Sequence, residues 1–385
     1  FNGKIDRPSL FGRALDLSEI ELLKEGRAAG DVGEALLAAW DFSLDISGQR
    51  VTDTGPRRLH GRTVNMPTRA VTGHNWTGNE VDVKAAPAEY GAIHFHDDDL
   101  EDADWEVDFE LTVPGDLASG VYAARLSSSD AEDSIPFFVR PPRGTASADI
   151  AFLIPTLTYL AYADQKFNNP DRMEVKGLEP GSSCPEDQFI VDERLHSLYD
   201  LHSDGSCVLY SSRLRPILNL RPGYYLPPLS IGAGSPHLLS ADLHLVDWLD
   251  AKSHRYDVIT DEDLHHEGVE LLAPYKVILT GTHPEYWTRQ MIEALESYKA
   301  RGGRFMYLGG NGFYWVTSVD PERPHVIEVR RWAGSRSCEA EPGQYHHSTT
   351  GELGGLWRYR NQAGQKLVGV GFTSMGSGEN RPYRR

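Results

Sequence analysis

Four apolar runs separated by helical patterns are the feature that most constrains the fold of this chain. The runs are "DIAFLIP", "YDVITDEDL", "YKVILTGTH" and "GRFMYLGGNG". Between them, "HLLSADLHLVDWLDAKS" and "RQMIEALESYKARG" have apolar residues at helical spacing. Apolar strands that alternate with helices are typical of a doubly wound, mostly parallel sheet, because such strands are buried on both faces. We therefore predict an α/β domain over residues 143–385.

The segment that precedes residue 143 is expected to be all-β. Its stretches "ALLAAWDFSL", "GAIHFHDD", "WEVDFELTVP" and "SGVYAARLSS" alternate apolar and polar residues, with Gly, Pro, Asp and Ser between them. The last of these, followed by "DSIPFFVRPP", is typical of the closing strands of an immunoglobulin-like sandwich. We therefore predict a β-sandwich over residues 35–142, followed by the linker "RPPRGTASAD".

Residues 1–34 resemble the C-terminal end of a laminin-G-like (concanavalin-type) jelly roll. The resemblance lies in "FNGKID" and in "RALDLSEIELL", where a strand gives way to a short helix capped by Asp16 or Ser18. The rest of such a domain would lie upstream of Phe1. We interpret the chain as an internal piece of a longer polypeptide, with its α/β domain truncated at the C-terminal end.

The balance of charges restricts the partners of this chain. Lys and Arg number 38 against 56 Asp and Glu, which gives a net charge of −18. Nucleic acid and anionic membranes would repel such a chain, so neither is expected as a partner. The three cysteines, Cys184, Cys207 and Cys338, have no metal-type spacing and indicate a reducing compartment rather than a disulfide framework. Without a membrane span or signal peptide in the sequence, we expect a cytoplasmic location.

Polar side chains follow several of the predicted parallel strands. Tyr159 and Tyr162 come after "AFLIP", His283 and Glu285 after "VILTGT", and Asn311 after "FMYLGG". In open parallel sheets, ligands bind beyond the carboxyl ends of the strands, so these groups are expected to meet at one edge. Taken singly, each has another interpretation. The tyrosines could pack in the core, Glu285 could stabilise the start of the next helix, and His283 could be a hydrogen-bonded loop residue.

Two further polar groups are interpreted as surface features. The stretch from Asp261 to His266 is expected to be a charged loop. His94 and His96 alternate along a strand and share one face, but no third metal ligand lies near them in the sequence. We therefore interpret this pair as polar surface side chains.

Known motifs narrow the chemistry. There is no Gly-x-Ser-x-Gly elbow, no His-Glu-x-x-His and no phosphate-binding Gly-rich loop. An amidotransferase relative that uses Cys207 is one alternative, although that cysteine does not follow a strand in the required manner. What remains is oxygen and imidazole chemistry. A carboxylate with phenolates is a hard ligand set, which suits oxidised iron better than zinc or copper(I).

Five stretches resemble one enzyme family. They are "TYLAYA", "LYDLHSDGS", "YSSRLRP", "GTHPEYW" and "GGNGFYW", and the likeness spans most of residues 38–385. The chain resembles the large subunit of N,N-dimethylformamidase. The resemblance implies an amidohydrolase that splits this small amide into dimethylamine and formate, with a mononuclear iron, Fe(III), on an amidotransferase-like α/β domain. It also implies a small helical partner subunit and a hetero-oligomer with paired large subunits.

The resemblance assigns the metal ligands position by position. The carboxylate ligand falls on Glu285 and one tyrosine ligand on Tyr199. The other tyrosine lies in "TYLAYA", where Tyr159 and Tyr162 both remain candidates. We place Tyr159 in the ligand set, since it lies nearer the end of the preceding strand.

The expected reaction is amide hydrolysis by a metal-activated water. His283 would accept the proton of that water, and Asn311 would donate a hydrogen bond to the developing oxyanion. An apolar pocket wall is expected from Trp287, Phe313 and Trp315. The alternative is a non-catalytic carbohydrate-binding or scaffold protein built from β-sandwich modules.

Overall fold

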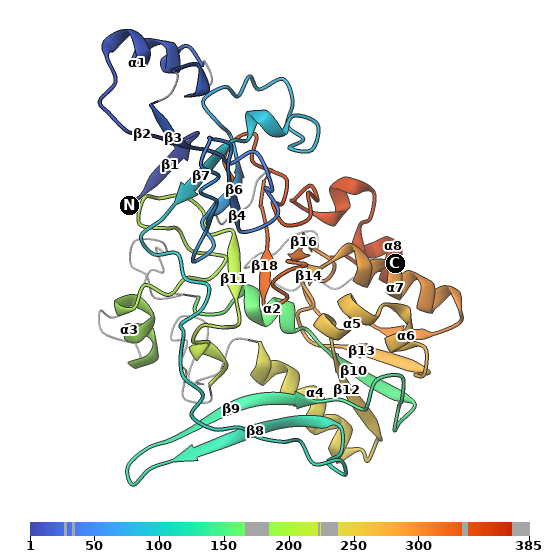
Figure 1. Cartoon of the computed structure of the whole chain (residues 1–385). Coiled ribbons are helices and arrows are strands. Elements are labelled where there is room, and N and C mark those ends of the chain that lie inside the picture. The colour runs from blue at the N-terminus through green and yellow to red at the C-terminus, as the bar shows by residue number, and fades with distance from the viewer. Residues whose placement is uncertain are drawn as a thin grey trace, which may run out of the picture.

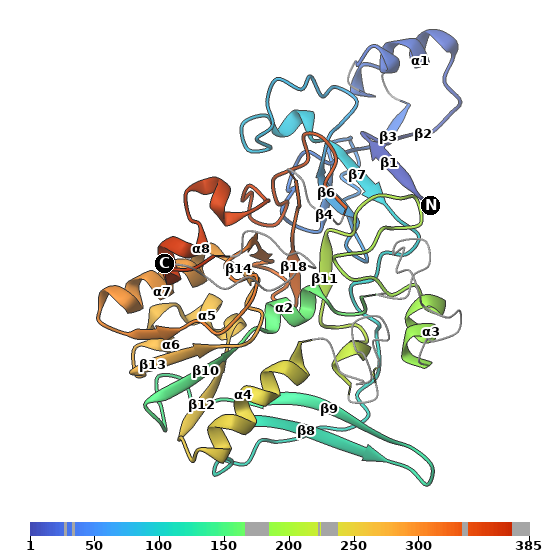
Figure 2. The same cartoon turned by 180° about the vertical axis from the view of Figure 1, so that it is seen from behind.

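The computed structural model describes most of the chain (Figure 1): residues 1–26, 29–32, 35–165, 185–221, 224, 238–332 and 338–371. The N-terminal strands lie at one end of the molecule and a long β-hairpin at the other, as the view from behind also shows (Figure 2). No helix within the described ranges is both long and apolar enough to cross a membrane.

A four-stranded parallel sheet lies between these two ends. Its order is β12–β10–β13–β15, with bounds Tyr256–Thr260, Ile150–Ile154, Val277–Thr280 and Arg304–Met306. All of its neighbouring strands pair in parallel. The four strands are those that the apolar runs predicted, so the sequence interpretation as an α/β protein is confirmed.

Helices cover both faces of this sheet. Phe152 and Ile154 of β10 pack with Leu239 and Leu249 of α4 (Leu239–Ala251). The alternate residues Ala151 and Leu153 belong to a different cluster, which includes residues of α7 (Arg289–Ala300), α5 (Asp261–Glu267) and α6 (Val269–Leu272). Successive side chains of a strand point to opposite faces, and here each face meets its own helices.

The N-terminal strands form two small antiparallel sheets. One has the order β1–β7–β6, with bounds Gly3–Asp6, Ala92–Phe95 and Thr68–Val71. The other has the order β2–β3–β4–β5, with bounds Ser9–Phe11, Leu36–Asp41, Arg50–Asp53 and Gly61–Arg62. Helix α1 (Leu17–Lys24) follows, and its capping box joins Asp16 and Glu19. Strands β1 and β2 therefore pair with strands from beyond residue 35.

One strand assignment and the place of one β-hairpin in residues 105–139 require correction. "WEVDFELTVP", predicted as a strand, has no strand pairing, and its apolar side chains are exposed. β8 (Gly120–Ser127) and β9 (Glu132–Val139) pair only with each other, and lie against β12 rather than the N-terminal sheets. Val121 and Phe138 pack into the cluster of Phe152, which supplies the apolar cover for this hairpin. Alternation predicts a strand but not the sheet on which it packs.

The cysteine interpretation is also corrected. Cys207 and Cys338 form a disulfide, with their Cα atoms 5.6 Å apart. Cys184 lies outside the described residues. The expectation that no disulfide forms is therefore wrong, and Cys207 is not a free thiol for nucleophilic catalysis. Spacing could not reveal this pair, because 131 positions separate its members.

Several shorter elements complete the described fold. The helices are η1 (Ala29–Val32), η2 (Pro87–Glu89), α2 (Thr156–Ala161), α3 (Pro185–Asp192), η3 (Leu218–Leu220), η4 (Trp357–Arg360) and α8 (Gly364–Val368). The strands are β11 (Tyr210–Ser212), β14 (Tyr286–Trp287), β16 (Trp315–Val316), β17 (Ser318–Val319) and β18 (Val326–Glu328). β14 pairs with β16, and the others form the sheet β11–β18–β17.

Candidate metal centre

Three oxygen-bearing side chains meet beyond the carboxyl ends of β10 and β13. Tyr162, at the end of α2, donates a hydrogen bond to Oε2 of Glu285 at 2.6 Å. The hydroxyl of Tyr199 donates to that of Tyr162 at 2.7 Å and lies 3.5 Å from the same Oε2 atom. The two tyrosine rings stack with their centroids 4.5 Å apart. Tyr162, Tyr199 and Glu285 thus form one group of hard oxygen donors.

Glu285 is held by its backbone and by one of its two carboxylate oxygens. Its N–H donates to Oγ1 of Thr158 at 3.1 Å, and its carbonyl accepts from the N–H groups of Tyr314 and Trp315. Oε1 accepts from the indole N–H of Trp315 at 3.0 Å. The side chain is only 2% exposed. These contacts leave Oε2 directed at the tyrosines.

Tyr286 and Arg331 extend the group, and the sequence interpretation missed both. The hydroxyl of Tyr286 donates to that of Tyr199 at 2.6 Å, and Nη2 of Arg331 donates to Tyr286 at 2.7 Å. The Arg331 guanidinium also lies over the Tyr199 ring, 4.4 Å from its centroid. Tyr286 could have been found from its position beside Glu285. No local pattern in "EVRRWAG" distinguishes Arg331.

Burial keeps these phenols protonated. It raises the pKa of Tyr162 and of Tyr199 above the ordinary value, and the nearby charge of Glu285 raises both further. The positive charge of Arg331 acts in the opposite direction on the pKa of Tyr199. A strong cation would therefore be needed to convert the two phenols to phenolates.

His283 lies at the side of this group with a ring nitrogen unsatisfied. Its Nε2 atom is 3.4 Å from Oε2 of Glu285, is buried, and makes no hydrogen bond. Its ring meets that of Tyr162 edge-on, at 6.3 Å between centroids. A buried nitrogen without a partner is uncommon in folded proteins and is expected where a ligand binds.

The loop that contains Asn311 packs directly on the His283 loop. The N–H of Gly310 donates to the carbonyl of Thr282 at 2.8 Å. A Cβ atom on Gly309 would lie 2.5 Å from Cδ of Pro284, so this close approach requires glycine. A Cβ atom on Gly310 would lie 3.3 Å from Nδ1 of His283, and Asn311, half-buried, is the next residue of this loop.

Tyr159 does not join the group, which corrects its place in the predicted ligand set. Its hydroxyl donates to Asp242 of α4, and its ring packs with Phe152 on the other face of the sheet. Helical spacing would put Tyr159 and Tyr162 on one face, but α2 ends at Ala161. Tyr162 therefore lies beyond the last helical turn and turns toward Glu285.

Two other interpretations also change. The segment that begins at Asp261 is a helix rather than a charged loop, and Asp261 is buried. Of the three aromatic residues expected to line a pocket, Trp315 contacts Glu285. Trp287 and Phe313 pack against each other in the core, 4.3 Å between ring centroids.

Comparison with known proteins places the chain in a family. The model of the family described as "N,N-dimethylformamidase beta subunit-like, C-terminal" matches residues 68–385. The chain belongs to this family. Among curated members, the N,N-dimethylformamidase beta subunit of Paracoccus aminophilus is 46% identical over 385 residues, and that of Alcaligenes sp is 45% identical over 387.

Each of these alignments covers 98% of this chain and 50% of the relative. The chain thus spans about half the length of the curated relatives it matches. The part matched by the N,N-dimethylformamidase beta subunit-like family includes Tyr162, Tyr199 and Glu285.

Proposed function

We propose that this chain is the iron-holding, catalytic part of an amide hydrolase that acts on N,N-dimethylformamide or a related small amide. The observation that carries the proposal is the meeting of Tyr162, Tyr199 and Glu285 at one buried point. The names of the two relatives support the substrate class. Their name as beta subunits also supports a multi-subunit enzyme.

The residues present fit a ferric ion. Tyr162, Tyr199 and Glu285 would hold it, since all three offer hard oxygen atoms within hydrogen-bond distance of one another. The Nε2 atom of His283 beside this group makes no hydrogen bond, which is a second observation that favours a bound cation or substrate. When bound, the iron supplies a Lewis acid that polarises the amide carbonyl and increases the acidity of water.

The side chains around this group have separate roles in the proposed reaction. His283 accepts a proton from the attacking water through Nε2, and Asn311 donates a hydrogen bond to the oxygen that becomes negative. The water oxygen bonds to the carbonyl carbon, the C–N bond breaks, and the leaving nitrogen takes a proton. The products are then dimethylamine and formate.

Arg331 assists the tyrosines without touching the substrate. Its guanidinium lies over Tyr199 and bonds to Tyr286, so its charge favours the ionised form of these phenols. It also donates to the carbonyl of Leu198, which fixes the backbone next to Tyr199. We assign Arg331 as a positioning residue for Tyr199.

We also propose an assembly for the enzyme. A small helical subunit and paired large subunits follow from the family resemblance. A cytoplasmic location stays a prediction, and the Cys207–Cys338 disulfide does not fit the reducing compartment from which it was argued.

The proposal is tested on the full-length protein, purified with any partner subunit, by measuring iron content and the release of dimethylamine. Glu285→Gln should lose both, because neutralising a ligand weakens the site without leaving a core cavity. His283→Gln should retain iron and lose turnover by about 100-fold or more, as expected for a proton acceptor. Glu296→Gln, on the exposed face of α7, is the control and should match the wild type.

Two results would contradict the proposal. A Glu285→Gln variant with full iron content would remove Glu285 from the ligand set. A wild-type protein that contains neither iron nor amidase activity after expression in iron-rich medium would favour the carbohydrate-binding alternative.

A further inference from the structure

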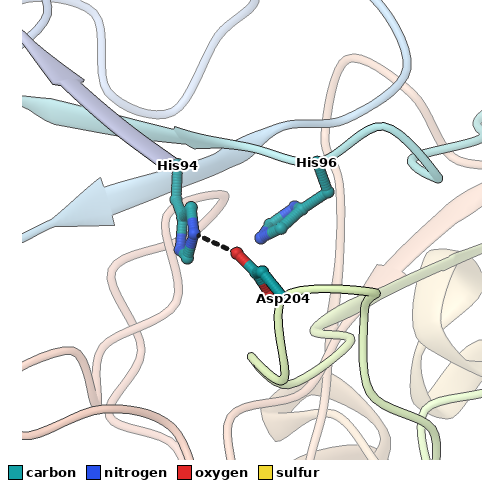
Figure 3. A group of neighbouring side chains, drawn as sticks. All are labelled: His94, His96 and Asp204. Atoms are coloured by element: carbon teal, nitrogen blue, oxygen red, sulfur yellow. Dashed lines mark hydrogen bonds and ion pairs between the residues drawn. The ribbon is translucent and has the colours of Figure 1, made fainter. Parts of the chain in front are cut away.

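A second group of metal-binding side chains lies away from the tyrosines. His94 of β7 and His96, which directly follows this strand, face Asp204 (Figure 3), and one ligand atom from each of the three residues lies within 4.8 Å of the other two. Nε2 of His94 is 2.8 Å from Oδ2 of Asp204. The sequence supplied only the first two of these residues. The third comes from a loop 110 positions further along the chain.

His96 is oriented as a metal-binding histidine usually is. Its Nδ1 atom lies 3.1 Å from Oδ1 of Asp99, which directs Nε2 toward the Asp204 loop. There Nε2 lies 3.0 Å from Oγ of Ser206, which itself donates to Oδ1 of Asp204 at 2.6 Å. A carboxylate on the second ring nitrogen is the usual support of a histidine ligand, because it fixes the ring and raises its basicity.

The ring geometry favours this group over its neighbours. The rings of His94 and His96 are not stacked: their planes are tilted by 47°, and both side chains point toward Asp204 (Figure 3). His96 and His202, which form a similar group with Asp99, are within 3° of parallel and 3.7 Å apart. A single cation cannot lie in the plane of both of those rings.

The third possible group is already satisfied by hydrogen bonds. Asp98 pairs with Nδ1 of His202 at 2.7 Å and with Nε2 of His196 at 3.1 Å. It also accepts the N–H of Ser203 at 2.8 Å. Both oxygens of Asp98 are therefore engaged, and this network supports the loop.

Burial and access also suit a cation at His94, His96 and Asp204. Both histidine residues are 8% exposed and therefore buried, whereas Asp204 is exposed to solvent, which gives an ion a path of entry.

We propose that His94, His96 and Asp204 bind one divalent cation of the zinc class, with water as the fourth ligand. Two imidazoles and a carboxylate with an open position are a ligand set that Zn²⁺ accepts. With bond lengths of about 2.0 Å, adjacent ligand atoms in a tetrahedral site are about 3.3 Å apart. The His94–Asp204 pair would need to widen by only about half an ångström. The ion would join β7 to the loop that follows Tyr199.

The test titrates the metal-free, full-length protein with Zn²⁺ in competition with a chromophoric chelator. The wild type should bind one equivalent of Zn²⁺. His94→Gln and Asp204→Asn should each weaken this binding by at least about 100-fold. Asp99 supports the ring of His96 without binding the ion itself, so Asp99→Asn should weaken Zn²⁺ binding by about 10- to 100-fold. His74→Gln is the matched control. His74 also pairs with a carboxylate, Asp6, at 2.6 Å, but no such group among the described residues includes it.

The titration is repeated in the Glu285→Gln background, where the same equivalent should remain, because the proposed iron ligands are not involved. Failure of the iron proposal would leave this result unchanged. The inference is overturned if the wild type binds no Zn²⁺, if the two ligand variants bind it as the wild type does, or if His74→Gln loses it equally. If His94→Gln fails to fold, Zn²⁺ binding by Asp204→Asn provides the test. The visible absorption of tetrahedral Co²⁺ bound to the wild type is then the second measurement.

Discussion

Tyr159 and Tyr162 are three residues apart, yet their hydroxyls reach carboxylates on different sides of the parallel sheet. Tyr159 donates to Asp242 and belongs to the core beneath α4. Tyr162 donates to Glu285, and its ring stacks on Tyr199. The end of α2 at Ala161 separates the two environments. A single helical turn thus decides which of two identical side chains is available to a metal.

The first prediction compares these two tyrosines. Tyr162→Phe should abolish the visible charge-transfer band of a ferric phenolate or reduce it to that of one tyrosine. Tyr159→Phe should leave the band unchanged but cost roughly 1–3 kcal/mol in the free energy of unfolding, because Asp242 loses a partner in the core. Absorption spectra and urea unfolding of both variants measure this. A band that depends on Tyr159 and not on Tyr162 would reverse the assignment.

At the scale of elements, one carboxylate connects the starts of two helices. Asp261, the first residue of α5, accepts hydrogen bonds from the Thr156 hydroxyl and the Leu157 N–H at the start of α2. Asp261 is 3% exposed, and its burial raises its pKa from 3.8 to about 7. Helix α2, which directly precedes Tyr162, thus begins on a carboxyl group whose protonation changes near neutral pH.

The second prediction concerns the pH dependence of stability. Because the folded-state pKa of Asp261 is above its unfolded value, its contribution is fully present below about pH 4. It is lost as the pH rises through about 7, by at most roughly 4 kcal/mol for a shift of about three units. Asp261→Asn should flatten this decline in urea unfolding between pH 4 and 8. Glu270→Gln, exposed on α6, should keep it. An unchanged slope in Asp261→Asn would refute the assignment.

The sequence predicted those strands and helices whose burial sets the spacing of their apolar residues. The strand β10 and the helix α7 could be read from apolar spacing, because burial on both faces or on one face fixes that spacing. The packing of the β8–β9 hairpin could not, since its apolar residues fit any uncovered sheet. Local patterns also did not show that Glu285 and Tyr199 meet. Only the family resemblance placed both in one ligand set. Arg331 and Asp204 depend on long-range contacts and left no local signal.

At the scale of the whole molecule, a buried ion pair joins the N-terminal sheets to the rest. Nε of Arg330 donates to Glu328 of β18 at 2.7 Å, and both side chains are fully buried. The same guanidinium donates to the carbonyls of Arg69 and Ala70 in β6, at 2.6 and 3.1 Å. Glu328 also accepts from the N–H groups of Ser348 and Thr349, so it is surrounded by donors.

The third prediction follows from this pair. Glu328→Gln should lower the free energy of unfolding by roughly 3–5 kcal/mol, because it leaves the buried charge of Arg330 uncompensated. Glu132→Gln is the matched control. Its partner Arg125 lies on the exposed face of the hairpin, so the loss should be below about 1 kcal/mol. Denaturant unfolding of both variants measures these losses. Equal losses would show that the contact between the N-terminal sheets and the rest of the molecule does not depend on the Arg330–Glu328 ion pair.

The Cys207–Cys338 disulfide has a consequence for the unfolded chain. A cross-link between residues 131 positions apart removes loop-closure entropy worth about 5 kcal/mol from the denatured ensemble. The closed loop contains Glu285, whereas Tyr199 lies just before it and Tyr162 lies further upstream. In the unfolded oxidised chain, Cys207, which follows Tyr199, stays bonded to Cys338, which follows Glu285. The oxidised chain therefore begins folding with part of the long-range search that joins Tyr199 to Glu285 already complete, and the reduced chain does not.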